Sequence, residues 1–197
     1  LGLTWPVIKV CHEMAHAWAL KRGGGEVHEM GLMFLVFMPV PYVDATAAAA
    51  FRSKWQRIGV SAAGILAEVF LAALAMFVWL AAEPGAVRAV AFNVMLVGGV
   101  STILFNANPL LRFDGYYMLA DLIEIPNLAQ RSNRHLGWLV KRYGFGAVDA
   151  VPPSQQPGER RWLTLYAPLA WCYRVVIMFS IALFVAASSL RAQHDDA

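Results

Sequence analysis

The chain has 197 residues, 59% of them hydrophobic, and a mean hydropathy of +0.52, which is too apolar for an ordinary soluble protein. The formal charge of +3 is small, and the 16 lysines and arginines are distributed as a membrane topology requires, with no signature of nucleic-acid binding. The composition therefore predicts an integral membrane protein in contact with the lipid bilayer.

Four hydrophobic segments are long enough to cross the roughly 30 Å hydrocarbon core as helices. The first ends at Lys21 and Arg22, before glycines that cannot sustain a helix. Because residue 1 is a leucine inside an apolar segment, we expect the chain to be a fragment or a processed form of a longer protein. We predict an all-α membrane protein with about four transmembrane helices, at residues 1–20, 58–82, 87–105 and 163–187.

The first segment contains a His-Glu-x-x-His motif at residues 12–16. Residues four apart share one face of an α-helix, so His12 and His16 can bind the same metal ion. Glu13 then lies beside the ion, where its carboxylate can take a proton from a water whose pKa zinc lowers to about 7. Two histidines and a glutamate are costly in an apolar helix unless they have a function, so the motif indicates metal-assisted hydrolysis.

Residues 31–43 are apolar but too short, and too interrupted by Pro39 and Pro41, to span a bilayer as a helix. We predict a short re-entrant β-hairpin at the membrane edge. Its backbone hydrogen-bonding groups must be buried against protein or must pair with a partner strand. An extended peptide that docks on this edge would satisfy both chains, and a purely structural re-entrant loop is the alternative.

Glu68 is the one charged residue buried in the second span, which makes it a functional candidate. Arg174, in the middle of the last span, needs a carboxylate or a wet pocket, and Glu68 is the partner to test. Lys9 lies four residues before Glu13 on the same helical face. We expect Lys9 to snorkel or to neutralise the negative charge of the site rather than to take part in chemistry.

The third span is followed by Asn-Ala-Asn-Pro at residues 106–109 and then by Asp114 and Gly115. The proline must break the helix, and the asparagines can bond the freed backbone groups. Such a break is tolerated at membrane depth where it lines a polar cavity, as a zinc site would. Asp114 is therefore a candidate third ligand, with an N-cap as its alternative role. His28 and Glu29 are weaker candidates, because they lie beyond the first helix.

The C-terminal part begins with residues 126–161, for which we expect a basic amphipathic helix on the cytoplasmic membrane surface and then a loop. A fourth transmembrane helix at residues 162–190 and a disordered tail at 191–197 complete the chain. Basic residues flank the links from the first to the second span and from the third to the fourth, whereas Arg88 and Arg191 lie on the other side. The first side is therefore predicted to be cytoplasmic, with the metal ligands close to it.

These motifs resemble the site-2 protease family of intramembrane zinc metalloproteases. That family carries His-Glu-x-x-His on one membrane helix and Asn-x-x-Pro-x-Pro-x-Leu-Asp-Gly on a later one. Residues 106–115 match the second motif, with Leu111 in place of the second proline and Phe113 in place of leucine. Residues 63–68, Ala-Gly-Ile-Leu-Ala-Glu, correspond to the family's Ala-Gly-Pro-x-Ala-Asn. The Asp-Gly-Tyr-Tyr sequence at 114–117 resembles the bacterial peptide zinc metalloprotease branch.

The resemblance implies a zinc metalloendopeptidase core at residues 1–125, made of three transmembrane helices and the hairpin at 31–43, in a bacterial inner membrane. Its substrate would be a transmembrane or membrane-associated peptide, clamped by the hairpin and cleaved near the cytoplasmic face. The residues implied are His12, His16 and Asp114 as Zn²⁺ ligands, Glu13 as general base, and Asn106 and Glu68 in binding or orienting the substrate.

Two other classes of function remain open. The alternative to the enzyme is a non-hydrolytic membrane module that binds a peptide or assists its export and keeps the metal as a structural clamp. The enzyme is favoured because Glu13 is present although it is not needed as a ligand. An ion transporter, which would carry metal across the membrane, is the third and least favoured class.

Overall fold

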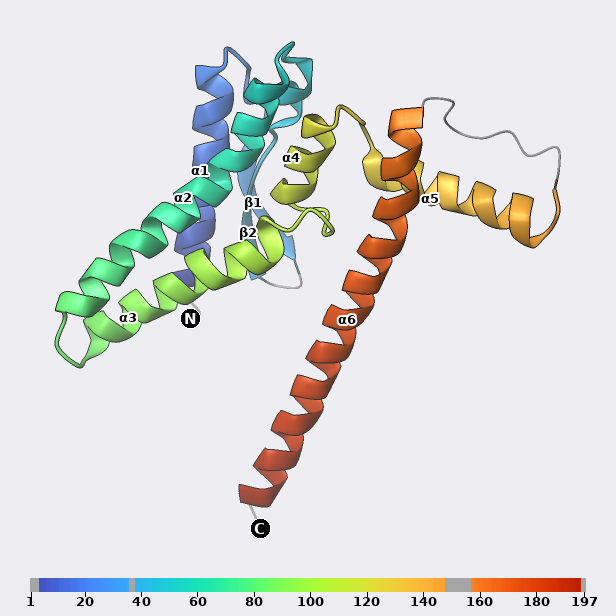
Figure 1. Cartoon of the computed structure of the whole chain (residues 1–197). Helices are drawn as coiled ribbons and strands as arrows, with labels where there is room; N and C mark the ends of the chain where they lie inside the picture. Colours follow the sequence, from blue (N-terminus) through green and yellow to red (C-terminus); the bar gives the residue numbers. More distant parts are fainter. Residues whose placement is uncertain (1–3, 36–37, 148–156, 196–197) are drawn as a thin grey trace. The chain divides into compact units, whose positions relative to one another are not determined.

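The computed structural model describes residues 4–35, 38–147 and 157–195 (Figure 1). Within these ranges the chain is mostly helical and contains one two-stranded antiparallel sheet. The chain divides into two compact units, Leu1–Glu124 and Ile125–Ala197. The prediction of a helical protein with a short hairpin is confirmed at this level.

The first unit contains the metal-site motifs and most of the secondary structure. Its elements are α1 (Thr4–Arg22), β1 (Met30–Leu35), β2 (Met38–Val43), the 3-10 helix η1 (Thr46–Ala50), α2 (Lys54–Ala81), α3 (Ala86–Met95), the π-helix η2 (Leu96–Asn106) and α4 (Asp114–Leu122). The second unit contains α5 (Leu128–Leu139), the π-helix η3 (Val140–Gly144) and α6 (Pro157–Asp195).

Three helices in the described part of the chain are long and apolar enough to cross a membrane: Lys54–Ala81, Ala86–Asn106 and Gly158–Ser189. They coincide with the second, third and last predicted spans, as expected for a membrane protein. Helix α1, predicted as the first span, is not among them, because Lys9 and the residues of the metal motif interrupt its apolar sequence.

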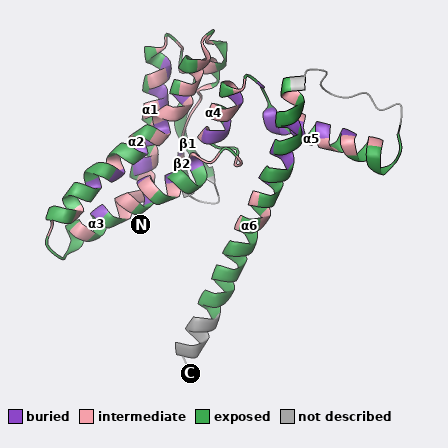
Figure 2. Ribbon diagram, viewed as in Figure 1, coloured by how far each residue is buried: buried purple, intermediate pink, exposed green. Residues whose placement is uncertain are grey.

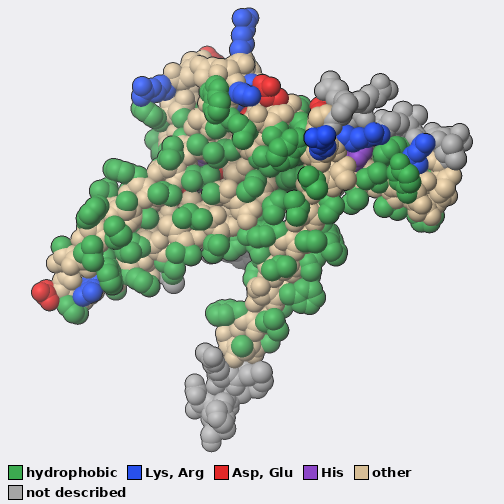
Figure 3. Space-filling model, in the orientation of Figure 1, with side chains coloured by type: hydrophobic (Ala, Val, Ile, Leu, Met, Phe, Trp, Pro, Cys, Tyr) green, Lys and Arg blue, Asp and Glu red, His purple; other side chains and the backbone are tan. Residues whose placement is uncertain are grey.

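The outward surface of α2 is strongly hydrophobic. Leu66, Phe70 and Phe77 are each more than 60% exposed. Green hydrophobic side chains cover α2 and α3 along their length in Figure 3, and Figure 2 shows these surfaces as exposed. Exposure of such a hydrophobic surface to water would be unfavourable, whereas the hydrocarbon core of a bilayer solvates it without cost.

Helix α2 is the packing centre of the first unit, since α1, α3, η2 and α4 all contact it. Small buried residues line its contacts, including Gly64, Ala72 and Ala75. Gly98 of η2 lies directly against the α2 backbone, because a Cβ atom there would be 2.7 Å from the carbonyl oxygen of Glu68. Small residues therefore let α1 and η2 approach α2 closely, which brings their polar side chains together.

The predicted hairpin is present as β1 and β2, with Met30 opposite Val43 and Leu32 opposite Pro41. Strand β2 packs against α1. Strand β1 has no second partner strand in the described chain, and its Leu32 and Phe34 side chains are 62% and 75% exposed. The hairpin thus presents an apolar edge strand beside the helix that carries the metal motif.

In the second unit α5 packs against α6. The buried face of α5 includes Leu128, His135 and Trp138, and its exposed face is polar, in agreement with the predicted amphipathic helix. The predicted loop falls largely at residues 148–156, outside the described residues. The expected disordered tail is wrong over 191–195: α6 continues to Asp195, because the helix-favouring residues there include no glycine or proline that would end it.

Candidate metal centre

Helix α1 places His12 and His16 on one face, as their spacing predicts. Both side chains are buried, with 5% and 7% of each residue exposed. Their Nε2 atoms lie 3.0 Å apart. The two imidazoles therefore point at one location from the same helix.

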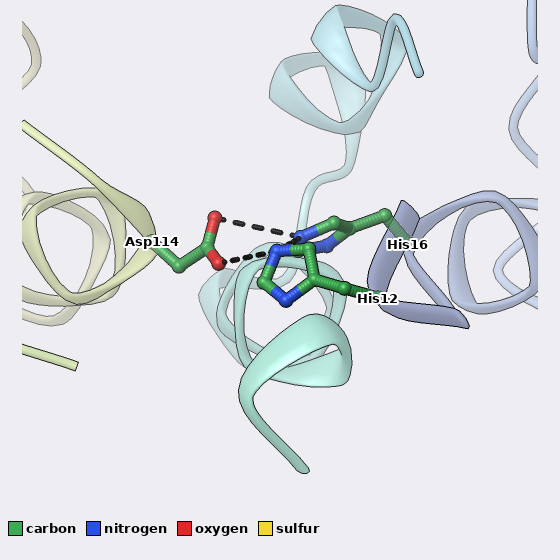
Figure 4. A group of neighbouring side chains, drawn as sticks. All are labelled: His12, His16 and Asp114. Carbon is green, nitrogen blue, oxygen red and sulfur yellow. Dashed lines mark hydrogen bonds and ion pairs between the residues drawn. The ribbon is translucent and has the colours of Figure 1, made fainter. Parts of the chain in front are cut away.

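Asp114 approaches that location from the start of α4 (Figure 4). Its Oδ2 atom lies 3.0 Å from Nε2 of His12, and its Oδ1 atom lies 3.5 Å from Nε2 of His16. The side chain of Asn108 accepts a hydrogen bond from the amide of Leu110 at 2.9 Å, so an asparagine does satisfy backbone freed by the break. The three predicted ligands come together, although their sequence positions span about half of the chain.

Gly115 sets the position of Asp114. A Cβ atom at residue 115 would lie 2.3 Å from the carbonyl oxygen of Ala107, closer than atoms can approach. The chain can therefore fold back on the end of η2 only if residue 115 lacks a side chain. The Asp-Gly pair brings α4 close to the break and turns the aspartate towards α1.

The separations of these donor atoms fit a tetrahedral metal ion. Ligands at the usual zinc distances of about 2.0–2.2 Å are about 3.3 Å from one another in a tetrahedron. The two Nε2 atoms lie 3.0 Å apart, Nε2 of His12 lies 3.0 Å from Oδ2 of Asp114, and Nε2 of His16 lies 3.5 Å from the other oxygen, Oδ1. One ligand atom from each of the three residues lies within 4.8 Å of the others. In the described chain, His12, His16 and Asp114 form the one group of three or more metal-competent side chains. His28 and Glu29 are exposed and do not belong to it.

The other ring nitrogens face oxygen acceptors. Nδ1 of His16 lies 2.7 Å from the carbonyl oxygen of Val60, which can only accept, so this nitrogen carries the hydrogen. Nδ1 of His12 lies 3.2 Å from Oε1 of Glu68, in a direction that makes the contact electrostatic rather than a well-aligned hydrogen bond. When the hydrogen of His12 also lies on Nδ1, facing Glu68, both Nε2 lone pairs face the Asp114 carboxylate, and three acceptors converge where a cation can satisfy them.

Gly64 of α2 provides the space for the imidazoles. A Cβ atom at this position would lie 2.4 Å from Cε1 of His12 and 2.5 Å from Nε2 of His16. Even an alanine would fill the place where the donor atoms converge. The sequence motif on α1 therefore depends on a cradle in α2, which the spacing of the histidines does not reveal.

The charge state of Asp114 suits a metal ligand. Burial by itself raises the pKa of this carboxyl group, but the adjoining His12 and His16 rings outweigh burial when they are protonated and hold the pKa at about 2. The carboxylate is therefore ionised near neutral pH. Protons on the rings and a metal ion are alternative sources of the positive charge that it faces.

Glu13 lies beside the three ligands, where its carboxylate is exposed to the charges of His12, His16 and Asp114 and faces the backbone amide of Val43. Val43 ends β2. Glu13 is therefore situated between the group of His12, His16 and Asp114 and the hairpin, without belonging to that group.

Glu68 and Asn106 lie behind the ligands, in a buried network. Glu68 is fully buried, and its Oε1 accepts from Nζ of Lys9 at 2.6 Å. Its Oε2 accepts from Nδ2 of Asn106 at 3.0 Å and from the hydroxyl of Thr102. Lys9 thus neutralises a negative charge of the site, as predicted. The role of Thr102 was missed, because nothing in its local sequence marks it.

No protein-family model, curated protein or solved structure matches the chain.

Proposed function

We propose that this chain is an intramembrane zinc metalloendopeptidase of the site-2 protease type. It hydrolyses a peptide bond in a membrane-embedded or membrane-associated peptide. The observation that carries this proposal is the convergence of His12, His16 and Asp114 within metal-binding distance, with Glu13 beside them.

His12, His16 and Asp114 would hold a zinc ion through three protein ligands, the number typical of catalytic rather than structural zinc sites. Such an ion would supply the Lewis acidity that activates water and polarises the scissile carbonyl. Glu13 accepts a proton from the attacking water as the new C–O bond forms, and it then delivers this proton to the amide nitrogen, so that the C–N bond breaks and the amine leaves. Asp114 and the two histidines hold the ion and do not exchange protons.

The hairpin is the proposed substrate clamp. Strand β1 has a free apolar edge, and an extended peptide can pair with it by backbone hydrogen bonds. Met30 pairs with Val43, the residue whose amide faces Glu13, so this end of the hairpin is next to the site. A substrate helix must unwind to bind, because its amides are otherwise engaged in intrahelical hydrogen bonds.

We also propose that α1 lies in the bilayer with the three apolar helices and that the site opens towards the cytoplasm. Lys21 and Arg22 end α1 shortly after His16, and basic residues are concentrated on the same side of the predicted spans. The exposed hydrophobic side chains of α1, including Val7, Met14 and Trp18, suit a lipid environment.

The test is proteolysis by purified protein in lipid nanodiscs with zinc and a synthetic transmembrane peptide, with the fragments identified by mass spectrometry. Wild type should produce defined fragments. Glu13→Gln should produce none, while it still binds zinc, because its carboxylate is not a ligand. Glu29→Gln, which changes an exposed carboxylate before β1, is the matched control and should cleave normally. Equal peptide patterns from wild type and Glu13→Gln would instead favour the non-hydrolytic peptide-binding module.

A further inference from the structure

A second carboxylate lies immediately behind the metal ligands. Glu68 has no solvent-exposed surface, and polar groups from α1 and η2 surround its two oxygens. Burial of a carboxylate is strongly unfavourable unless it is paired and hydrogen-bonded, and here both conditions are met. Three donors on one buried carboxylate, one of them the ammonium group of Lys9, suggest a role beyond helix packing.

The first reason is the orientation of His12. Metal-binding histidines commonly donate their other ring N–H to a carboxylate or a backbone carbonyl, which fixes the ring and increases its strength as a ligand. His16 follows this pattern through the carbonyl of Val60 at 2.7 Å. His12 has Glu68 in the equivalent place, with Nδ1 3.2 Å from Oε1. A small rotation of the ring as it binds an ion would align this contact into a hydrogen bond.

The second reason is charge. The described charged groups around the ligands are the carboxylates of Asp114, Glu13 and Glu68 and the ammonium group of Lys9. When both imidazole rings are neutral, as metal ligands are, three ionised carboxylates against one ammonium group leave two negative charges in an apolar environment. A divalent cation balances that excess, and Glu68 supplies part of the attraction.

We propose that Glu68 is a positioning residue of the metal centre, which holds the His12 ring in its ligand orientation and strengthens metal binding. Thr102 and Asn106 fix the carboxylate, and Lys9 balances part of its charge. This inference rests on the metal centre of the proposed function. It assigns Glu68 and Asn106 to the support of a ligand rather than to contact with the substrate.

The experiment measures zinc affinity of the whole purified chain by competition with a chromophoric chelator, in wild type, Glu68→Gln and Lys9→Met. The two variants break the same ion pair from opposite ends. Glu68→Gln should weaken zinc binding by about 10–100-fold, the usual effect of losing such a partner. Lys9→Met should leave zinc affinity unchanged or increase it, because it removes a positive charge from the site.

Three further measurements separate positioning from a merely structural role. The absorption spectrum of the Co²⁺-loaded protein should change in Glu68→Gln and not in Lys9→Met. Glu159→Gln, which removes a carboxylate paired with Arg131 in the other unit, should leave zinc affinity and the Co²⁺ spectrum unchanged. If Glu68→Gln does not fold, the double variant Lys9→Met with Glu68→Gln leaves no unpaired, half-buried ammonium group. This double variant should fold and still bind zinc at least about tenfold more weakly than wild type.

The outcomes are distinct. The inference would be overturned if Glu68→Gln bound zinc as tightly as wild type. It would also be overturned if Glu68→Gln and Lys9→Met lost zinc affinity equally. A wild type that binds zinc but cleaves no peptide would refute the endopeptidase and leave the role of Glu68 standing. A folded wild type that binds no zinc would overturn both proposals.

Discussion

The Nδ1 atom of His16 on α1 lies 2.7 Å from the carbonyl oxygen of Val60 on α2. This carbonyl begins the part of α2 that forms the metal cradle, and Gly64 follows one turn later. The orientation of a ligand on one helix is thus set by the backbone of another, so changes in α2 should affect metal binding although α2 contributes no ligand.

Gly64→Ala should abolish stoichiometric zinc binding and peptide cleavage, because its Cβ atom would occupy the space between the imidazoles. The chain has a matched control in Gly59→Ala, since a Cβ atom there meets nothing within 4 Å. Zinc content after dialysis, measured by elemental analysis, distinguishes the two. Normal zinc content in Gly64→Ala would show that the imidazoles do not need this space.

Gly115→Ala should displace α4 and with it Asp114, because the added methyl group would meet the backbone of Ala107. We expect the free energy of unfolding to fall by about 1–3 kcal/mol, the usual cost of forcing an extra carbon into a packed site. Zinc affinity should fall as well. Gly99→Ala, whose Cβ would make an ordinary 3.7 Å contact with Ala72, is the control. Thermal unfolding measures the change in stability, and competition with a chelator measures the change in zinc affinity. If Gly115→Ala has the stability and the zinc affinity of wild type, the role assigned to Gly115 is wrong.

Removal of zinc with a chelator should lower the unfolding temperature of wild type. A ligand that binds only the folded state at 100 times its Kd stabilises by about 2.7 kcal/mol, and this contribution disappears with the metal. His12→Ala, which lacks one of the three ligands, should unfold at a temperature that the chelator changes little. Differential scanning fluorimetry in detergent makes the comparison. An equal chelator effect in both proteins would place the stabilising ion elsewhere.

The stability of the second unit should fall as the pH decreases below about 6.5. Burial, and next to it the positive charge of Arg160, lower the pKa of His135 in the folded protein. The unfolded chain therefore takes up a proton at a pH where the folded chain does not, and protonation favours unfolding. The stabilisation is complete above the ordinary histidine pKa and is lost as the pH falls towards the lowered value.

The pH dependence can be attributed to His135 by substitution. Its Nε2 lies 3.1 Å from Oγ1 of Thr164, so His135→Gln keeps a polar group near that hydroxyl without a titratable ring. Unfolding of wild type and His135→Gln by denaturant at pH 7.5 and pH 5.5 measures the effect, and wild type should lose more stability. His28→Gln, an exposed substitution, should behave like wild type. A parallel loss in wild type and His135→Gln would assign the pH dependence to other groups.

The sequence predicted the parts of the site that depend on local periodicity or on chain-breaking residues. Helical spacing brings His12 and His16 together, and the Asn-Pro break correctly identified Asp114 as their neighbour. Length and hydropathy located three of the helices that can span a membrane. These features depend on residues close in sequence or on composition, which a sequence displays directly.

The remaining features depend on which helix faces meet. Lys9 and Glu68 are 59 residues apart, and their pairing follows from the close approach of α1 and α2. Arg174 was an equally reasonable partner by charge alone. The requirement for glycine at position 64 likewise arises from the imidazoles of another helix, so hydropathy and spacing could not reveal it.

The π-helical winding of η2 makes the site dependent on the length of this segment as well as on its side chains. A π-helix contains more residues per turn than an α-helix, and η2 uses this winding to direct Thr102 and Asn106 towards Glu68. Deletion of one residue here would change either the winding of η2 or the rotation of every residue that follows around the axis. Either change would displace Asp114 relative to α1, although no ligand had been altered.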